Sequence, residues 1–323
     1  MEDTSKVIPQ AAERKKLISV MVPTYNEEEN VIPLTEAIIA EFEKSLPQYD
    51  YEIVFIDNCS TDTTRPKLRE LCAGNKRIKA IFNARNFGQF NSPYWGICQT
   101  HGDCTVTCCA DFQDPIEMIP KLVAKWEEGY RVVCAIKTTS KENKIMRFLR
   151  TCYYKTIRKM STVEQIEHFT GFGLYDRTFV DVLRNVDDPS PFLRGIIAEL
   201  GFAKVEVPYE QAKRRAGKTH NNFKTLYDAA MLSFTSYTKT PIRFFTFLGA
   251  FLMGASVLGA AACLVAELAF FGAGFWWLAP VIGFFGSLNL IATGILGEYV
   301  LLLRSKINKR PLVVEELRIN FDE

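Results

Sequence analysis

The chain has 323 residues, of which 48% are hydrophobic, and this is enough for one or two domains with a substantial core. Its formal net charge of +2 argues against nucleic acid as a partner, because nucleic-acid-binding domains carry a clear basic excess. The nine cysteines follow no zinc-binding spacing, which is typical of reduced, buried thiols in a cytoplasmic protein. Residues 1–16 are polar and lack the apolar core of a signal peptide, so we expect this domain not to be exported.

Apolar runs of strand length alternate with helical patterns between residues 17 and 136. The expected strands cover residues 17–22, 51–56, 78–82, 105–109 and 132–136. The expected helices cover residues 26–42 and 66–72, and a further helical stretch runs through Trp95 and Ile97. This alternation predicts an α/β fold in which a mostly parallel, Rossmann-like sheet has helices on both faces.

Polar loops follow three of these strands. They contain residues 24–27, 57–62 and 111–113. In a parallel sheet the ligand lies beyond the carboxyl ends of the strands, so we expect these loops to form one site for a ribose, a base and a metal-bound diphosphate. The chain has no Gly-x-Gly-x-x-Gly after the first strand and no P-loop signature, which disfavours a dinucleotide-binding or P-loop protein.

The third loop carries the candidate metal ligands. Its sequence is Cys108-Cys109-Ala110-Asp111-Phe112-Gln113-Asp114-Pro115. Asp111 and Gln113 offer oxygen ligands at alternating positions, and Mg²⁺ takes one or two carboxylates and completes its shell with substrate phosphates and water. An acidic residue at a strand end can instead be a helix cap or turn former, and Asp114-Pro115 has the sequence of one.

Two features of the second half of the chain point to a membrane. Residues 141–160 mix basic and apolar side chains, which fits either a helix in a membrane interface or a helix packed on the sheet with a solvated basic face. Residues 244–266 and 268–297 contain no charged residue, and each stretch exceeds the roughly 20 helical residues that span a membrane. A transmembrane hairpin is therefore predicted, rather than a helical pair in a soluble core, and flanking basic residues place both termini in the cytoplasm.

Seven motifs occur in order along the chain. Four are residues 22–30 (VPTYNEEEN), 55–62 (FIDNCSTD), 85–88 (RNFG) and 110–115 (ADFQDP). The other three are residues 171–176 (GFGLYD), 214–219 (RRAGKT) and 297–299 (GEY), the last followed by Arg310-Pro311. The first four resemble family 2 glycosyltransferases of the GT-A fold. The others resemble the polyprenyl-phosphate glycosyltransferases of that family, relatives of dolichol-phosphate mannose synthase and of bacterial enzymes that load undecaprenyl phosphate.

The resemblance implies a role for individual residues at a nucleotide-sugar site. The residues that would contact the nucleotide sugar are Pro23, Tyr25, Glu27, Asp57 and Asp111. Asp111 and Gln113 would coordinate Mg²⁺ or Mn²⁺, which neutralises the diphosphate leaving group. Together with Arg214, these two residues form the predicted catalytic set.

Basic residues are expected to contact phosphate groups of the donor or of the lipid. They are Arg214, Lys218 and Arg150. An arginine offers a planar, bidentate fork for a phosphate, and a lysine offers a mobile point charge. The alternative for this basic cluster is a surface patch attracted to anionic lipid, and the two roles are compatible.

Five positions depart from the family pattern, among them Cys59, which stands where a glycine is common, and Gln89, which stands where a basic residue is common. Cys109 and Gly171 stand where relatives have acidic residues, and His220 stands where a lysine is common. Because Gly171 cannot act as a base, the acceptor would have to supply its own nucleophile. A phosphate monoester can do so, since its second pKa is about 6 and it is largely dianionic at pH 7.

The predicted domain organisation has five parts. They are a polar N-terminal tail (1–16), a cytoplasmic GT-A catalytic domain (17–215), membrane-proximal interfacial helices (216–242), two transmembrane helices (243–304) and a cytoplasmic C-terminal tail (305–323). By resemblance, we expect a multi-pass protein of the inner (plasma) membrane, in contact with membrane lipids, that forms a homo-oligomer, namely a tetramer.

The predicted function is transfer of a single sugar from a nucleotide sugar, with a UDP-sugar favoured, to a polyprenyl phosphate such as undecaprenyl phosphate. The transfer would take place on the cytoplasmic membrane face and invert the anomeric centre. The alternative is a catalytically silent sugar-nucleotide-binding or scaffolding membrane protein, suggested by Cys109, Gly171 and His220. A processive polysaccharide synthase is disfavoured, because the chain has one hairpin and no Gln-x-x-Arg-Trp motif.

Overall fold

The computed structural model describes residues 14–139, 166, 169–189, 191–216, 278–307 and 310–321, with a few positions between 247 and 259. The chain divides into two compact units. The first comprises residues 1–141, 167–219 and 311–323, and the second comprises residues 142–166 and 220–310. The predicted basic segment with Arg150, the position of Lys218 and most of the first predicted membrane helix lie outside the described residues.

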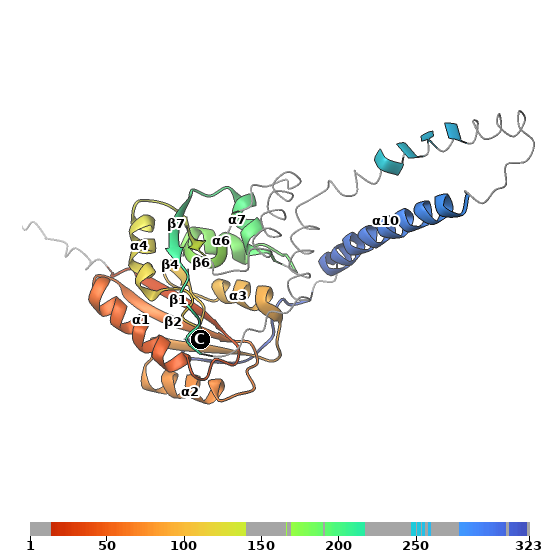
Figure 1. Ribbon diagram of the computed structural model, residues 1–323. Coiled ribbons are helices and arrows are strands. Elements are labelled where there is room, and N and C mark those ends of the chain that lie inside the picture. The colour runs from red at the N-terminus through yellow and green to blue at the C-terminus, as the bar shows by residue number, and fades with distance from the viewer. Residues whose placement is uncertain are drawn as a thin grey trace, which may run out of the picture. The chain divides into compact units, whose positions relative to one another are not determined.

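A single eight-stranded sheet forms the framework of the first unit (Figure 1). Its strands are β1 (Leu17–Thr24), β2 (Asp50–Asp57), β3 (Ile78–Asn83), β4 (Cys104–Thr107), β5 (Val132–Thr139), β6 (Phe169–Asp176), β7 (Lys204–Glu210) and β8 (Glu315–Ile319). Across the sheet they follow the order β7-β5-β6-β4-β1-β2-β3-β8. Because β1 pairs in parallel with both β2 and β4, the carboxyl ends of these three strands lie at one edge of the sheet.

Helices pack on both faces of the sheet, as the sequence predicted. In the first unit they are α1 (Val31–Ser45), α2 (Thr64–Gly74), α3 (Gly88–Cys98), the short 3₁₀ helix η1 (Ile116–Met118), α4 (Ile119–Glu127), α6 (Arg177–Arg184) and α7 (Leu193–Leu200). Helices α1 and α4 share a buried core with Val20 of β1. On the other face Gly96 of α3 lies against Met21 and Ile56, so closely that an added Cβ would be 2.6 Å from the Ile56 side chain. Strands covered on both faces are mostly apolar, and the runs in β1 and β2 are long enough to be recognised in the sequence although Ser19 and Glu52 interrupt them.

The sheet is mixed: four of its seven strand pairings are parallel and three are antiparallel. Strand β6 pairs antiparallel with both β4 and β5, and β8 pairs antiparallel with β3. The sequence did not predict β6 because Gly171 and Gly173 interrupt its apolar pattern. Gly173 is needed there, because an added Cβ would lie 2.4 Å from the backbone oxygen of Val133 in β5.

Strand β8 lies in the segment that the sequence assigned to a C-terminal tail. Its five residues, Glu-Glu-Leu-Arg-Ile, are at least partly exposed and carry three charges, so no apolar alternation marks them as a strand. The strand covers the edge of β3, with Phe82 opposite Leu317 and Ala80 opposite Ile319. An uncovered strand edge exposes unpaired backbone groups; β8 pairs with those of β3 and becomes the edge strand itself, where its charged side chains disfavour pairing with another chain.

Asp176 at the end of β6 is a buried structural carboxylate. It accepts hydrogen bonds from Trp126 Nε1 at 2.7 Å, from Arg131 Nη1 at 2.9 Å and from Thr178 N at 2.9 Å, the last of which caps α6. Burial alone would raise the pKa of Asp176, but these donors outweigh burial and lower the pKa. The ionised carboxylate therefore contributes stability that is complete above its ordinary pKa and is lost as the pH falls through the lowered pKa.

Replacing this carboxylate should destabilise the first unit. We expect Asp176→Ala to lower the free energy of unfolding by about 2 kcal/mol, because the buried Trp126 Nε1 and two partly exposed donors lose their acceptor. Asp181→Ala is the matched control: the Asp181 side chain is half exposed and pairs with Arg184 at 2.9 Å, and its loss should cost less than about 1 kcal/mol. Chemical denaturation at pH 7 measures both values, and equal losses would contradict the structural role of Asp176.

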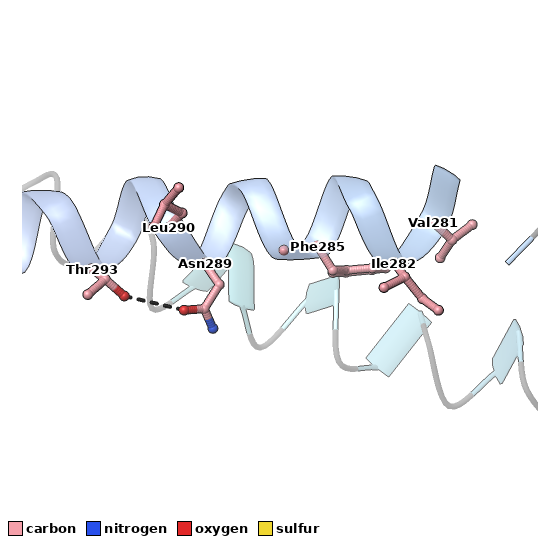
Figure 2. Close-up of a pocket in the computed structure, with 7 residues that line it drawn as sticks. Val281, Ile282, Phe285, Asn289, Leu290 and Thr293 are labelled. Carbon is pink, nitrogen blue, oxygen red and sulfur yellow. Dashed lines mark hydrogen bonds between the residues drawn. The ribbon is translucent and has the colours of Figure 1, made fainter. Parts of the chain in front are cut away.

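The second unit contains α10 (Leu278–Ile307), a helix of 30 residues. Figure 2 shows a shallow pocket along it, lined by Val281, Ile282, Phe285, Gly286, Asn289, Leu290 and Thr293, with Thr293 Oγ1 donating to Asn289 Oδ1 at 3.3 Å. In the part of the chain that the structure describes, no helix combines the length and the apolar character needed to cross a membrane. The transmembrane hairpin therefore stays a prediction.

Candidate active site

The backbone is strained in each of the loops that follow β1, β2 and β4. Asn26, Cys59 and Phe112 have φ angles of 55°, 65° and 59°, one in each loop. Among the described residues only Asn320 is another non-glycine residue with positive φ. Such conformations cost on the order of 1 kcal/mol or more each and persist where surrounding contacts enforce them, which is typical of functional sites.

The first two loops are bound tightly to each other. Asn26 donates from its backbone N to Ser60 Oγ at 2.9 Å and accepts at Oδ1 from Thr61 N at 2.8 Å. Glu27 N donates to Thr64 Oγ1 at 2.9 Å. The segment with Tyr25 and Glu27 thus has a fixed position relative to the loop after β2, as a preorganised binding site requires.

Asn58 joins the third motif, residues 85–88, to the same edge of the sheet. Its Oδ1 accepts from Asn83 Nδ2 at 3.2 Å and from Phe87 N at 2.9 Å, and its Nδ2 donates to Asn86 Oδ1 at 2.9 Å. The amide of Asn58 can satisfy donors and acceptors at once, which explains why an amide rather than a carboxylate stands here.

The three predicted catalytic residues come together after β4. The buried carboxylate of Asp111 accepts at Oδ2 from Arg214 Nε at 3.0 Å and lies 2.8 Å from Arg214 Nη2. Its Oδ1 accepts from Gln113 N at 3.1 Å. The backbone holds the same segments together, since Arg215 N donates to Asp111 O at 3.2 Å and Ala212 N donates to Gln113 O at 3.3 Å.

Glu27 lies beside this ion pair. Its Oε1 is 4.0 Å from Arg214 Nη2, and its Oε2 accepts from Asn30 Nδ2 at 2.6 Å. Burial raises the pKa of Glu27 and outweighs the hydrogen bond from Asn30 and the charge of Arg214, while the negative charge of Asp111 raises the pKa further. The contact of Asn30 with Glu27 was not predicted from the sequence, because nothing in the spacing of the two residues marks them as partners.

The raised pKa of Glu27 leads to a stability prediction. When folding raises the pKa of a carboxyl group, the protein loses stability as the pH rises from the ordinary pKa through the raised one, so at pH 7 Glu27 makes the fold less stable than a neutral side chain would. Glu27→Gln cannot ionise and keeps an acceptor for Asn30, so we expect it to melt above the wild type at pH 7. The difference should shrink as the pH falls towards about 4. A variant that melts several degrees below the wild type at pH 7 would contradict this account.

Asp57, at the end of β2, is completely buried and held from inside the protein. Its Oδ2 accepts from Arg65 Nε at 2.6 Å, and Ser60 N donates to the same carboxylate at 3.2 Å. The sequence placed Asp57 at the nucleoside, and that contact stays a prediction. Arg65 was missed, because one arginine in the first turn of α2 is unremarkable in the sequence.

Asp114 forms a turn rather than a helix cap. Its Oδ2 accepts from Cys109 N at 2.9 Å and its Oδ1 accepts from Tyr209 OH at 3.1 Å. The helical segment begins at Ile116 without a side-chain cap. Burial raises the pKa of Asp114. The contacts of Asp114 fix the shape of the loop that carries Asp111. Cys109, in the same loop, is exposed.

The remaining predicted contacts and the metal ligands can be placed only in part. Pro23 and Tyr25 are half-buried at the end of β1. No group of three or more His, Cys, Asp and Glu residues able to hold a metal occurs in the described segments. The carboxylate of Asp111 and the amide of Gln113 nevertheless fit a hard cation that takes its other oxygens from a diphosphate and water. Arg214 competes for this carboxylate, since it already binds Oδ2 of Asp111.

Comparisons with known proteins agree with this fold. Residues 19–195 match the family described as Glycosyl transferase family 2. The chain is 32% identical over 297 residues to a prophage-derived bactoprenol glucosyl transferase of Shigella flexneri, covering 91% of this chain and 96% of the relative. It is 29% identical over 300 residues to a putative glycosyltransferase of Bacillus subtilis, covering 92% and 91%. A solved mannosyltransferase from Pyrobaculum calidifontis, in complex with GDP-Man and Mn²⁺, aligns with a TM-score of 0.44 at 17% identity, over 93% of this chain and 89% of that one.

The family match and the Shigella flexneri relative, together with the sheet and its three polar loops, define the protein as a glycosyltransferase. The chain belongs to glycosyl transferase family 2, which confirms the family and the enzyme class predicted from the motifs.

Proposed function

We propose that the protein transfers one sugar from a nucleotide sugar, with a UDP-sugar favoured, to a polyprenyl phosphate such as undecaprenyl phosphate. One observation carries the proposal: Asp111, Gln113, Arg214 and Glu27 meet at the carboxyl edge of the sheet, in a chain similar over nine-tenths of its length to a bactoprenol glucosyl transferase. The name of that relative states the lipid and the sugar of the relative itself. It supports a lipid acceptor here and leaves the sugar open.

The donor would bind across the three loops. Asp111 and Gln113 would hold Mg²⁺ or Mn²⁺, which supplies charge neutralisation at the diphosphate when bound. The loops with Tyr25, Glu27 and Asp57 would receive the nucleoside. Because those loops are joined by hydrogen bonds before any ligand binds, little ordering entropy is lost on binding.

The acceptor would act without a protein base. An oxygen of the lipid phosphate, already largely dianionic at pH 7, forms a bond to the anomeric carbon. The bond from that carbon to the diphosphate breaks, and the electron pair leaves with the nucleoside diphosphate. Attack from the face opposite the leaving group inverts the anomeric centre. Arg214, which lies 2.8 Å from Asp111, would stabilise the negative charge that develops on the leaving diphosphate, and such stabilisation is strongest where water is excluded.

The proposed location is the inner (plasma) membrane, with the catalytic domain (17–215) and both termini in the cytoplasm. The uncharged stretches 244–266 and 268–297 support a two-helix membrane anchor. Exposed apolar side chains along α10 also support contact with lipid or with another copy of the chain; they include Phe284, Leu290, Ile291, Leu296 and Val300. We propose a homo-oligomer on the same grounds.

A transfer assay tests this function. Full-length protein in detergent is given undecaprenyl phosphate, Mn²⁺ and a panel of radiolabelled nucleotide sugars, and label that becomes extractable into organic solvent is counted. We expect lipid-linked label with at least one donor, dependent on both the lipid and the cation. Binding of a nucleotide sugar without any lipid-linked product would favour the catalytically silent alternative.

A further inference from the structure

We propose that Arg65 and Glu316 are positioning residues for the donor nucleotide, so that the C-terminal strand β8 forms part of the donor site. The inference rests on the proposed function, because it assigns these residues to the loop that would receive the nucleoside. It also gives a role to a segment whose sequence resembles a solvated tail.

Arg65 uses its whole guanidinium group to join three segments. Nε donates to Asp57 Oδ2 at 2.6 Å, Nη1 donates to Glu316 Oε2 at 2.9 Å, and Nη2 donates to Asn83 O at 2.7 Å. The guanidinium also lies 5.5 Å from the ring centroid of Phe82. Each contact takes a different nitrogen of one planar fork, which a lysine could not reproduce.

Strand β8 is firmly attached to the sheet, so Glu316 has a defined position. The pairing of β8 with β3 is extended by one hydrogen bond, in which Ala84 N donates to Val314 O at 3.0 Å. Beyond the strand, Asn320 Nδ2 donates to Cys72 O at 2.6 Å and to Ile78 O at 2.8 Å. The carboxylate of Glu316 is therefore presented to Arg65 by a rigid element rather than by a mobile tail.

A chain of contacts runs from β8 to both nucleoside loops. Glu316 holds Arg65, Arg65 holds Asp57, and Asp57 accepts from Ser60 N. Ser60 Oγ then accepts from Asn26 N, next to Tyr25 and Glu27. A displaced Arg65 would change the orientation of the Asp57 carboxylate and shift the loops that it holds.

The two ends of this series of contacts, Asp57 and Glu316, differ in what they contribute to the stability of the fold. Asp57 is completely buried, so removing its partner leaves an unpaired buried charge and endangers the fold. The Glu316 side chain is 55% exposed, and exposed ion pairs contribute little to stability. Replacing Glu316 therefore separates a role in positioning from a role in folding.

The test combines Glu316→Ala, Arg65→Lys and the double variant. Full-length protein in detergent is titrated calorimetrically with UDP and with GDP, and donor KM and kcat are measured in the transfer assay. We expect Glu316→Ala to weaken binding of the nucleoside diphosphate about two- to five-fold and Arg65→Lys about ten-fold. Donor KM should rise in parallel, with kcat unchanged. Because the residues act through one contact, the double variant should be no weaker than Arg65→Lys alone.

Glu315→Ala is the matched control. Glu315 lies on the same strand and pairs with Arg318 at 2.7 Å instead of with Arg65, so its loss should leave nucleotide binding unchanged. The inference is overturned if Glu316→Ala binds like the wild type, or if Glu315→Ala weakens binding equally. If the wild type binds neither nucleotide, the proposed function itself fails; if the wild type binds and transfers sugar while Glu316→Ala equals it, only the positioning role fails.

Discussion

Asp111→Asn should reduce kcat by on the order of 10³-fold while leaving the protein folded. The amide has the same shape as the carboxylate, and its oxygen can still accept from Gln113 N, which donates to Asp111 Oδ1 at 3.1 Å in the wild type. What the variant loses is the negative charge that would seat a divalent cation. Arg214 loses the charge of its partner, but its side chain is one-quarter exposed, so water can solvate the guanidinium group and the fold should persist.

The control for this change is Asp181→Asn. Asp181 forms an ion pair with Arg184 at 2.9 Å on the surface of α6, away from the three loops. Removing its charge should leave kcat within a factor of two. Steady-state transfer rates and melting temperatures of both variants complete the comparison. An Asp111→Asn enzyme with more than a tenth of the wild-type kcat would show that this carboxylate does not hold the cation.

Arg214→Ala should produce the second large effect, a loss of about 10²-fold in kcat. The variant lacks the guanidinium group that would stabilise negative charge on the diphosphate leaving group. It should also bind Mn²⁺ more tightly than the wild type in the absence of nucleotide, because Arg214 no longer occupies Oδ2 of Asp111. Calorimetric titration with Mn²⁺ measures this gain independently of turnover.

Arg215→Ala is the matched control, because it removes a positive charge at the residue next to Arg214. The Arg215 guanidinium lies 5.1 Å from the ring centroid of Phe112 and is not paired with Asp111 through its side chain in the described contacts. We expect near wild-type kcat and unchanged Mn²⁺ affinity for this variant. Equal behaviour of the two variants would mean that only the overall basic charge of the segment matters, and the specific pairing of Arg214 with Asp111 would be irrelevant.

Local sequence patterns were sufficient to predict the central part of the fold. The predicted strands 17–22 and 51–56 correspond to β1 and β2, because strands that are buried on both faces are rich in apolar residues. The three polar loops were correctly placed at one sheet edge, because parallel strands carry their following loops to the same side. These features depend on neighbouring residues alone.

The parts that the sequence did not predict depend on distant contacts. Asp111 and Arg214 were both predicted to be site residues. Their hydrogen bond joins residues 103 positions apart, and no local sequence pattern predicts that pairing. The contact between Arg65 and Glu316 spans 251 positions. Strand β8 can be recognised only from its pairing with the edge of β3, because the composition of β8 itself resembles that of a loop.

The most direct measurement is the anomalous diffraction signal of Mn²⁺ in crystals of the full-length protein grown with Mn²⁺ and the nucleoside diphosphate that it binds most tightly. We expect one strong peak within coordination distance of the Asp111 carboxylate and in contact with the diphosphate. The Arg214 side chain should then no longer contact Oδ2 of Asp111. A diphosphate bound beyond β1, β2 and β4 with no cation near Asp111, or a cation held by other residues, would contradict this account.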